Sequence, residues 1–186
     1  MLTRMLLLIG LGAALCRPAA AAVSLPDLRG VVRAVPAPQA RATVLFFIAH
    51  DCPIANGYAP EIQRIAARYA PRGVACLLVY VEPDLTAAGA RKHCAAYGYR
   101  VPALRDLRHA LVRMTGATVT PEAVVLAPDG HALYRGRIDD KYVSLGQPRY
   151  RVSRHDLRDA LDAIVQHRPV PHPATTALGC FIPPLG

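Results

Sequence analysis

The sequence predicts an α/β fold in which a central mixed β-sheet is flanked by helices on both faces. Two continuously apolar, β-rich runs, residues 43–48 and 74–81, are each followed by a helical pattern, and two later strands are joined by an Asp-Gly turn. Apolar runs of this length are typical of strands covered on both faces. Strands connected through a helix lie parallel, whereas a hairpin adds an antiparallel pair, so the sheet must be mixed.

The first two helices follow the two apolar strands. Residues 55–69 place Tyr58, Ile62 and Ile65 on one face, and this amphipathic helix ends near Pro71. A second helix is predicted over residues 86–97.

The second half of the domain contains the hairpin and a last helix. Strands 123–127 and 132–137 bracket Asp129-Gly130, a dipeptide typical of tight hairpin turns. The last helix is expected to open at Ser153, with Asp156 three residues later as its capping-box partner, and to end before Pro169.

Both ends of the chain differ from this domain. Residues 1–22 combine a basic start, an apolar stretch and three alanines, which predicts a signal peptide cleaved near Ala22 and export to a periplasmic or extracellular location. The apolar stretch is too short for a membrane-spanning helix, so no stable membrane insertion is expected. Residues 23–169 form one domain, with an extended lead-in and a small hairpin around Arg29-Gly30, and residues 170–186 form a proline-rich tail carrying Cys180.

Charge and cysteine content exclude several function classes. Without Arg4 and Arg17, the mature chain has 20 basic and 13 acidic side chains, a net charge of +7, and the arginines are scattered. No nucleic-acid motif is present, so no nucleic-acid partner is expected. Four cysteines remain, without a CxxC motif or a zinc-finger Cys/His spacing. We therefore expect no metal and no cofactor, and the disulfide pairing stays open.

Cys52 is the first candidate for chemistry. It stands directly after the first buried strand and before Pro53, whose fixed φ suits the first turn of a helix. A thiolate at this position is stabilised by unpaired backbone N–H groups and the helix dipole, so its pKa should fall below the free value of about 8.5. His50, if protonated and near, would add to this effect, and Asp51 would oppose it. The alternative is an inert buried cysteine or half of a static disulfide.

These residues carry a family resemblance. Residues 44–66, followed about 55 residues later by Thr120-Pro121 and the hairpin, resemble the thioredoxin-like superfamily, especially its exported redoxin and TlpA-like branches and the related AhpC/TSA peroxiredoxin group. The resemblance covers roughly residues 25–166. It implies that Pro121 follows a cis peptide bond and lies against Cys52, which leaves the Thr120 backbone free to pair with an extended substrate.

Three departures limit what the resemblance implies. Ala55 stands where a CxxC oxidoreductase has its second cysteine, so Cys52 cannot use that cycle. Ala49 and Leu45 stand where peroxiredoxins carry Thr or Ser and Pro. In the copper-delivering Sco group the second cysteine would fall at Asn56 and the histidine ligand near Thr120 or Pro121, so two of three soft-metal ligands are missing.

A second thiol is needed to resolve the product of the first. Cys180 is the leading candidate, because its tail is long enough to return to the sheet and Gly179 permits a close backbone approach. The alternatives are that Cys180 only staples the tail or pairs with another chain. Cys76 is expected in the core, and Cys94 in the core or half-buried, with a resolving role or a Cys76 pairing as its alternative.

Two further sets of residues have open roles. Residues 136–142 form a dense polar loop that either carries function or anchors the final helix through salt bridges. The remaining histidines are expected to be surface or helix-cap residues: His109, His131, His155, His167 and His172.

The sequence thus predicts an exported thiol–disulfide redoxin in which Cys52 attacks, Pro121 and Thr120 shape the groove, and Cys180 resolves the intermediate. His50, Pro53 and Asn56 are expected to support the site. The partners would be a protein thiol or disulfide, or a small hydroperoxide, and a thiol electron donor. Two alternatives remain: a thiol-dependent peroxidase of the AhpC/TSA type, and a non-catalytic Cu(I) or thiol binding module.

Overall fold

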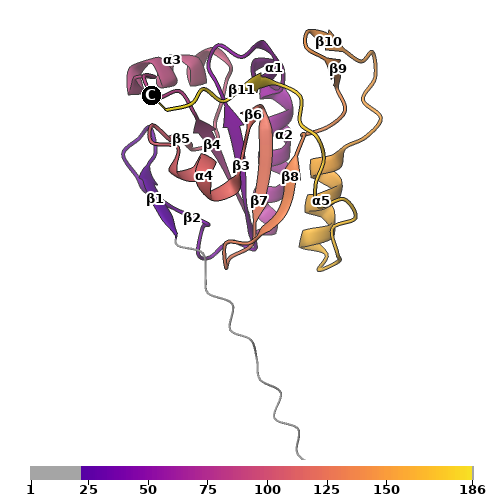
Figure 1. The fold of residues 1–186 in the computed structure, drawn as a ribbon. Helices are drawn as coiled ribbons and strands as arrows, with labels where there is room; N and C mark the ends of the chain where they lie inside the picture. Colours follow the sequence, from indigo (N-terminus) through magenta and orange to yellow (C-terminus); the bar gives the residue numbers. More distant parts are fainter. Residues whose placement is uncertain (1–21, 186) are drawn as a thin grey trace, which may run out of the picture.

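The computed structural model describes residues 22–185, so all of the predicted signal peptide except Ala22 lies outside the described residues. Its centre is a five-stranded sheet in the order β5-β4-β3-β7-β8 (Figure 1). β3 is parallel to β4, and β4 to β5, whereas β7 is antiparallel to both of its neighbours. This confirms the predicted mixed sheet. The strands are β3 (Ala42–Ile48), β4 (Val74–Tyr80), β5 (Ala103–Arg105), β7 (Glu122–Leu126) and β8 (Ala132–Gly136).

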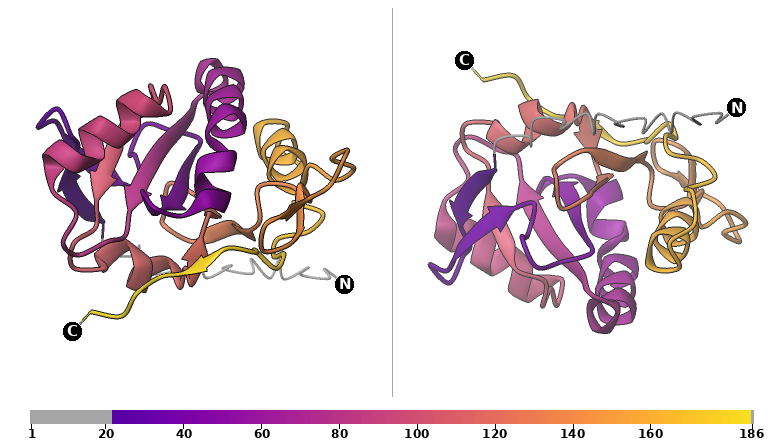
Figure 2. Two further views of the ribbon diagram at one scale, coloured as in Figure 1. Left: turned by 90° about the horizontal axis from the view of Figure 1, so that it is seen from above. Right: turned by 90° about the horizontal axis from the view of Figure 1, so that it is seen from below.

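Helices lie on both faces of the sheet, as predicted. α2 and α5 pack together on one face, and α4 lies on the other (Figures 1 and 2). Arg158 of α5 is joined to Glu61 of α2 by an ion pair, which links the two helices. The helices are α1 (Pro53–Gly57), α2 (Ala59–Tyr69), α3 (Ala87–Ala96), α4 (Ala110–Thr115) and α5 (Asp156–Val165), with a 3₁₀ turn at Ala70–Arg72.

Short strands complete the fold. The predicted N-terminal hairpin is confirmed: β1 (Val23–Pro26) pairs with β2 (Val32–Val35), and Gly30 in the turn has φ +84°, where a side chain would be strained. The other short strands are β6 (Val119–Thr120), β9 (Tyr142–Ser144), β10 (Gln147–Pro148) and β11 (Cys180–Phe181).

The core positions the functional edge of the sheet. All seven residues of β3 are buried, which explains their continuous apolar character. Ile48 at the end of β3 pairs with Tyr80 at the end of β4. Because parallel strands end at the same edge, the residues that follow β3 and β4 are brought together, among them Cys52 and Glu82.

The prediction of one helix over residues 55–69 is wrong. α1 begins at Pro53 and ends at Gly57, and α2 begins at Ala59. The reason is Pro60, which lacks a backbone N–H and whose ring would clash with the carbonyl four residues earlier in a continuous helix. Tyr58 at the junction donates its hydroxyl to the Asp139 carboxylate at 2.7 Å, which fixes the break.

The predicted capping box at Ser153 is also wrong. α5 begins at Asp156, its N-cap is His155, and no side chain caps it. The Ser153 hydroxyl instead donates to Asp140 at 2.6 Å, and Asp156 is ion-paired with Arg137 at 2.7 Å. Asp140 and Arg137 of the polar loop therefore bind the two side chains, Ser153 and Asp156, that would have formed the capping box.

Sequence patterns did not reveal β5, α4 or the pairing of the tail. β5 has three residues and α4 has six, too few for a clear periodicity. The carboxylate of Asp106 accepts from three backbone N–H groups at the start of α4, on Ala110, Leu111 and Val112. The proline-rich tail, predicted to be long enough to return to the sheet, does return and forms β11 beside β6 (Figure 1).

Candidate active site

Cys52 lies at the N-terminal end of α1. It is the N-cap residue with extended backbone (φ −80°, ψ 109°), and Pro53 starts the helix behind it. The residue is only 1% exposed, and its sulfur donates to the Thr120 carbonyl at 3.0 Å. The buried strand β3 and the proline therefore hold the thiol at the edge of the sheet, against the segment that contains Pro121.

The peptide bond between Thr120 and Pro121 is cis, as the resemblance implied. A second cis bond, Val35-Pro36, was not predicted. Pro121 also lines a small hollow of about 150 Å³, together with Tyr58 and Tyr142. Because the Cys52 sulfur bonds the Thr120 carbonyl, the cis peptide bond lies beside the thiol.

The tail places a second thiol at the same point. Cys180 in β11 is the register partner of Thr120, and Phe181 of Val119. The Thr120 hydroxyl donates to the Cys180 carbonyl at 3.5 Å, and the Ile182 N–H donates to the Thr118 carbonyl at 3.0 Å. Cys52 and Cys180 are both free thiols, and each shifts the pKa of the other.

The two thiols have opposite acidities. Burial raises the pKa of Cys52, but hydrogen bonds from the Cys180 thiol, the Ala55 backbone N–H and the Thr120 hydroxyl outweigh burial and lower the pKa below its usual range. Burial, the adjacent Cys52 sulfur and the charge of Asp51 raise the pKa of Cys180 to about 12. Cys52 is therefore the better nucleophile, and Cys180 keeps its proton.

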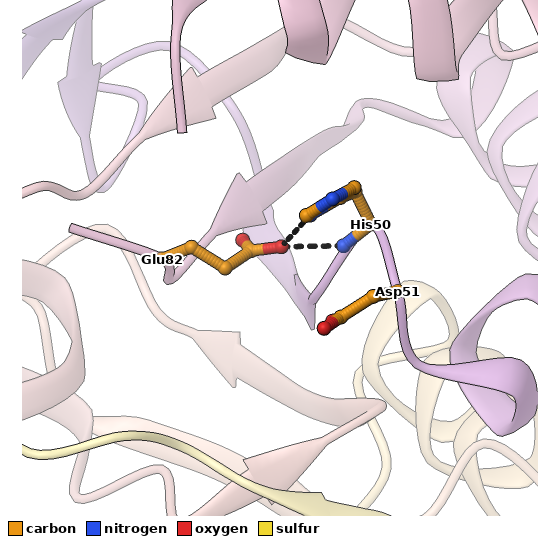
Figure 3. Close-up of side chains that lie close together, drawn as sticks. All are labelled: His50, Asp51 and Glu82. Atoms are coloured by element: carbon orange, nitrogen blue, oxygen red, sulfur yellow. Dashed lines mark hydrogen bonds and ion pairs between the residues drawn. The ribbon is translucent and has the colours of Figure 1, made fainter. Parts of the chain in front are cut away.

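His50 does not face Cys52 in the way the sequence suggested. Its ring Nδ1 lies 2.7 Å from Oε1 of Glu82, which also accepts from the His50 backbone N–H at 2.5 Å (Figure 3). Asp51, expected to oppose the ionisation of Cys52, acts on Cys180. Glu82 was missed at the sequence level, although a carboxylate directly after a buried strand is a recognisable pattern.

His50, Asp51 and Glu82 are the residues best placed to hold a metal ion. Within residues 22–185, they form the one group of three whose donor atoms all lie within 4.8 Å of one another (Figure 3). Two carboxylates and an imidazole suit a hard or borderline divalent cation, not Cu(I). Glu82 Oε1 already binds His50, and Asp51 is exposed, so this group is compatible with an ordinary ion pair at the surface.

Asn56 supports the loop before Cys52. Its amide donates to the His50 carbonyl at 3.0 Å, and its Oδ1 lies 2.8 Å from Nε2 of His93. The other ring nitrogen of His93 lies 2.7 Å from the Tyr80 hydroxyl. Sequence reasoning missed this polar chain, because its members come from α1, α3 and β4 and meet only in the folded protein.

The polar loop 136–142 is an anchor in this structure. Arg137 pairs with Asp156, and Asp140 accepts from Ser153 and from the Arg154 N–H. These bonds hold the Asp140 pKa well below its usual range despite the effect of burial.

The same loop also reaches the α1 side of the site. The Lys141 ammonium donates to the Gly57 carbonyl at 2.7 Å. A Cβ on Gly57 would meet the Tyr142 hydroxyl, so the glycine makes room for this loop. Through Lys141 and Tyr142, the loop thus fastens α1 beside Cys52.

The other two cysteines lie away from the thiol pair, and two of the remaining histidines stand at helix N-cap positions. Cys76 was expected in the core but is half-buried, because it lines an apolar hollow of about 850 Å³. Burial raises its pKa to about 12. Cys94 is half-buried near the Tyr80 hydroxyl at 3.2 Å. His155 stands at the N-cap position of α5 and is exposed, as expected. His109 stands at the N-cap position of α4 but is buried, with Nε2 2.7 Å from the Val81 carbonyl. Neither side chain makes a capping hydrogen bond.

No helix within residues 22–185 is both long and apolar enough to cross a membrane.

Comparisons with known proteins agree with this architecture. A family model described as the AhpC/TSA family matches residues 18–135. A hypothetical protein from Sinorhizobium meliloti is 26% identical, with 88% of this chain and 91% of that chain covered and a TM-score of 0.77. An uncharacterized conserved protein from Geobacillus kaustophilus is 27% identical, with 91% and 93% covered and a TM-score of 0.76.

A third solved structure links the fold to disulfide chemistry in another protein. It is a secreted Mycobacterium tuberculosis disulfide oxidoreductase homologous to E. coli DsbE, 17% identical, with 76% of this chain and 95% of that chain covered and a TM-score of 0.55. At this identity the likeness establishes the thioredoxin-like fold alone. No curated protein matches the chain.

Proposed function

This chain belongs to the AhpC/TSA family and is a thiol-dependent oxidoreductase, and we propose that it is an exported redoxin that exchanges disulfides through Cys52 and Cys180. The observation that carries the proposal is the pairing of β11 with β6, which brings Cys180 from the end of the chain to Cys52. The opposite pKa shifts support Cys52 as the nucleophile and Cys180 as the resolving thiol.

The reaction balances with one dithiol and one disulfide. The Cys52 thiolate attacks one sulfur of a substrate disulfide, forms a mixed disulfide with it and releases the other sulfur as a thiolate. Cys180 then loses its proton and attacks the Cys52 sulfur, so the remaining substrate thiolate leaves and takes up a proton. The protein ends with a Cys52–Cys180 disulfide, and an external thiol donor reduces it.

The deciding experiment traps the intermediate. Reduced Cys180→Ser protein mixed with a disulfide-bonded protein should accumulate a mixed disulfide at Cys52, whereas the wild type should release reduced substrate and contain a Cys52–Cys180 bond by mass mapping. Cys94→Ser is the matched control, since this thiol is not paired with Cys52, and it should behave as the wild type. Turnover without a Cys52–Cys180 disulfide would refute Cys180 as the resolving thiol.

Peroxide reduction is the second candidate, because the family match includes peroxidases of the AhpC/TSA type. In that reaction the Cys52 thiolate attacks the hydroperoxide, forming a sulfenic acid and an alcohol or water, and Cys180 condenses with the sulfenic acid to a disulfide and water. Stopped-flow mixing with hydrogen peroxide separates the two reactions. A peroxidase should consume peroxide far faster than a Cys52→Ser variant and faster than a free thiol.

A further inference from the structure

The edge of β6 is occupied by the chain's own tail. Within the described residues, β6 takes no part in the five-stranded sheet and pairs only with β11. In Figure 1 the tail crosses the domain as an extended segment beside β6. The pairing covers two residues on each strand, with one more backbone bond from Ile182 to Thr118. So short a ladder is easily opened, and an opened strand edge is a ready template for an extended peptide.

The tail also covers the nucleophile. Cys52 is 1% exposed, and β11 holds Cys180 opposite Thr120, whose carbonyl accepts from the Cys52 sulfur. A substrate disulfide has to bring one of its own sulfurs to the same atom. Cys180 and a substrate cysteine therefore compete for one position, and the substrate can enter only when the tail has left.

The backbone geometry restricts which residue can precede a cysteine in this position. A Cβ at Gly179 would lie 2.0 Å from the Thr120 carbonyl oxygen, 2.6 Å from its carbon and 3.1 Å from the Pro121 nitrogen. All three are backbone atoms, so none can rotate away. The side chain that follows the cysteine is unrestricted, because Phe181 is 86% exposed.

We propose that Gly179–Ile182 is a tethered occupant of the substrate edge, and that the site takes extended polypeptide segments in which glycine directly precedes the disulfide-bonded cysteine. This inference rests on the proposed disulfide exchange. It adds the class of substrate, and it identifies the tail as the gate that controls access to Cys52. Substrate binding and resolution are then alternating events at one edge. The mixed disulfide forms while the tail is away. The substrate segment then detaches from β6 while its cysteine stays bonded to Cys52, and the returning tail brings Cys180 to attack the Cys52 sulfur, so that the substrate thiolate leaves.

The gate is tested in a Cys180→Ser background, where Cys52 reacts without resolution. Adding Gly179→Ala should prevent docking of the tail and speed the reaction of Cys52 with a dipyridyl disulfide at least tenfold per thiolate, with the thiolate fraction taken from a pH titration of each variant. His172→Ala, an exposed position of the same tail outside Gly179–Ile182, is the control and should leave the rate unchanged. If Gly179→Ala lowers the melting temperature strongly, Ile182→Pro replaces it, because it removes the N–H that bonds Thr118.

The substrate class is tested with two peptides in the tail-released variant. One carries Gly-Cys and the other Ala-Cys, each with the cysteine activated as a pyridyl disulfide. The glycine peptide should form its mixed disulfide with Cys52 at least tenfold faster. Equal rates for both peptides, or no change in the rate of Cys52 on tail release, would overturn this inference. The proposed function would still stand as long as Cys52 reacts with the small disulfide. Failure of Cys52 to react with any of these disulfides would overturn both.

Discussion

Cys52 is buried and Cys76 is half-buried, yet the more buried thiol is the more acidic one. Cys52 has hydrogen-bond donors around its sulfur, and its pKa is lowered despite burial. Cys76 lies at an apolar hollow, where burial alone acts and raises its pKa to about 12. Cys94 is intermediate, since burial raises its pKa and the Tyr80 hydroxyl partly offsets this. Burial alone therefore does not make a thiol unreactive, because hydrogen-bond donors around the sulfur can stabilise the thiolate.

The largest expected effect concerns Cys76 and alkaline pH. In the unfolded chain this thiol ionises near pH 9.0, whereas in the folded protein it keeps its proton up to about 12. Unfolding therefore releases a proton between these values, so the contribution to stability is complete below pH 9.0 and is lost as the pH rises through this window.

Replacing Cys76 by Ala should remove this dependence. Urea unfolding at pH 8 and pH 11 should show that the stability of the wild type relative to Cys76→Ala falls by about 3 kcal/mol, at ~1.4 kcal/mol per pH unit above the free pKa. Tyrosines that titrate in the same range are common to both proteins and cancel. A constant difference between the two proteins would show that Cys76 ionises as freely in the folded state as in the unfolded chain.

A smaller effect is expected at the reactive thiol. Thr120→Val keeps the shape of the side chain but removes a hydroxyl that stabilises the Cys52 thiolate, so the pKa of Cys52 should rise and the thiolate fraction at neutral pH should fall. Titration of the thiolate absorbance would measure it. Thr118→Val is the matched control, because that side chain is exposed. Identical titrations for both variants would show that the Thr120 hydroxyl does not stabilise the Cys52 thiolate.

The smallest expected effect concerns the pKa of Cys94. Tyr80→Phe removes the hydroxyl beside Cys94, so the pKa of Cys94 should rise further. The pH dependence of alkylation at Cys94, resolved by mass spectrometry, would measure the change. Tyr99→Phe serves as the control, since the Tyr99 hydroxyl is buried and has no hydrogen-bond partner. A larger rise in Tyr99→Phe would contradict the assignment of Tyr80 as the donor.

The sequence by itself determined the elements whose physics is local. The buried strands before and after α2, the Asp129-Gly130 hairpin and Cys52 ahead of Pro53 follow from apolar runs, turn chemistry and the fixed φ of proline. The resemblance around Pro121 added the cis bond. Local patterns misled where a neighbour in space competed for the same groups: Asp140 took the Ser153 hydroxyl from the predicted cap, and Pro60 divided a continuous apolar face into two helices.

Only the tertiary structure decided what surrounds Cys52. The spacing of 128 residues between Cys52 and Cys180 made their meeting one possibility among several, and the backbone pairing of β11 with β6 selected it. His50 was turned to Glu82 rather than to the thiol, because the end of β4 supplies a carboxylate that the sequence separates from it by 32 residues. Such contacts depend on which strand edges and loop ends the fold brings together, and no local pattern encodes that arrangement.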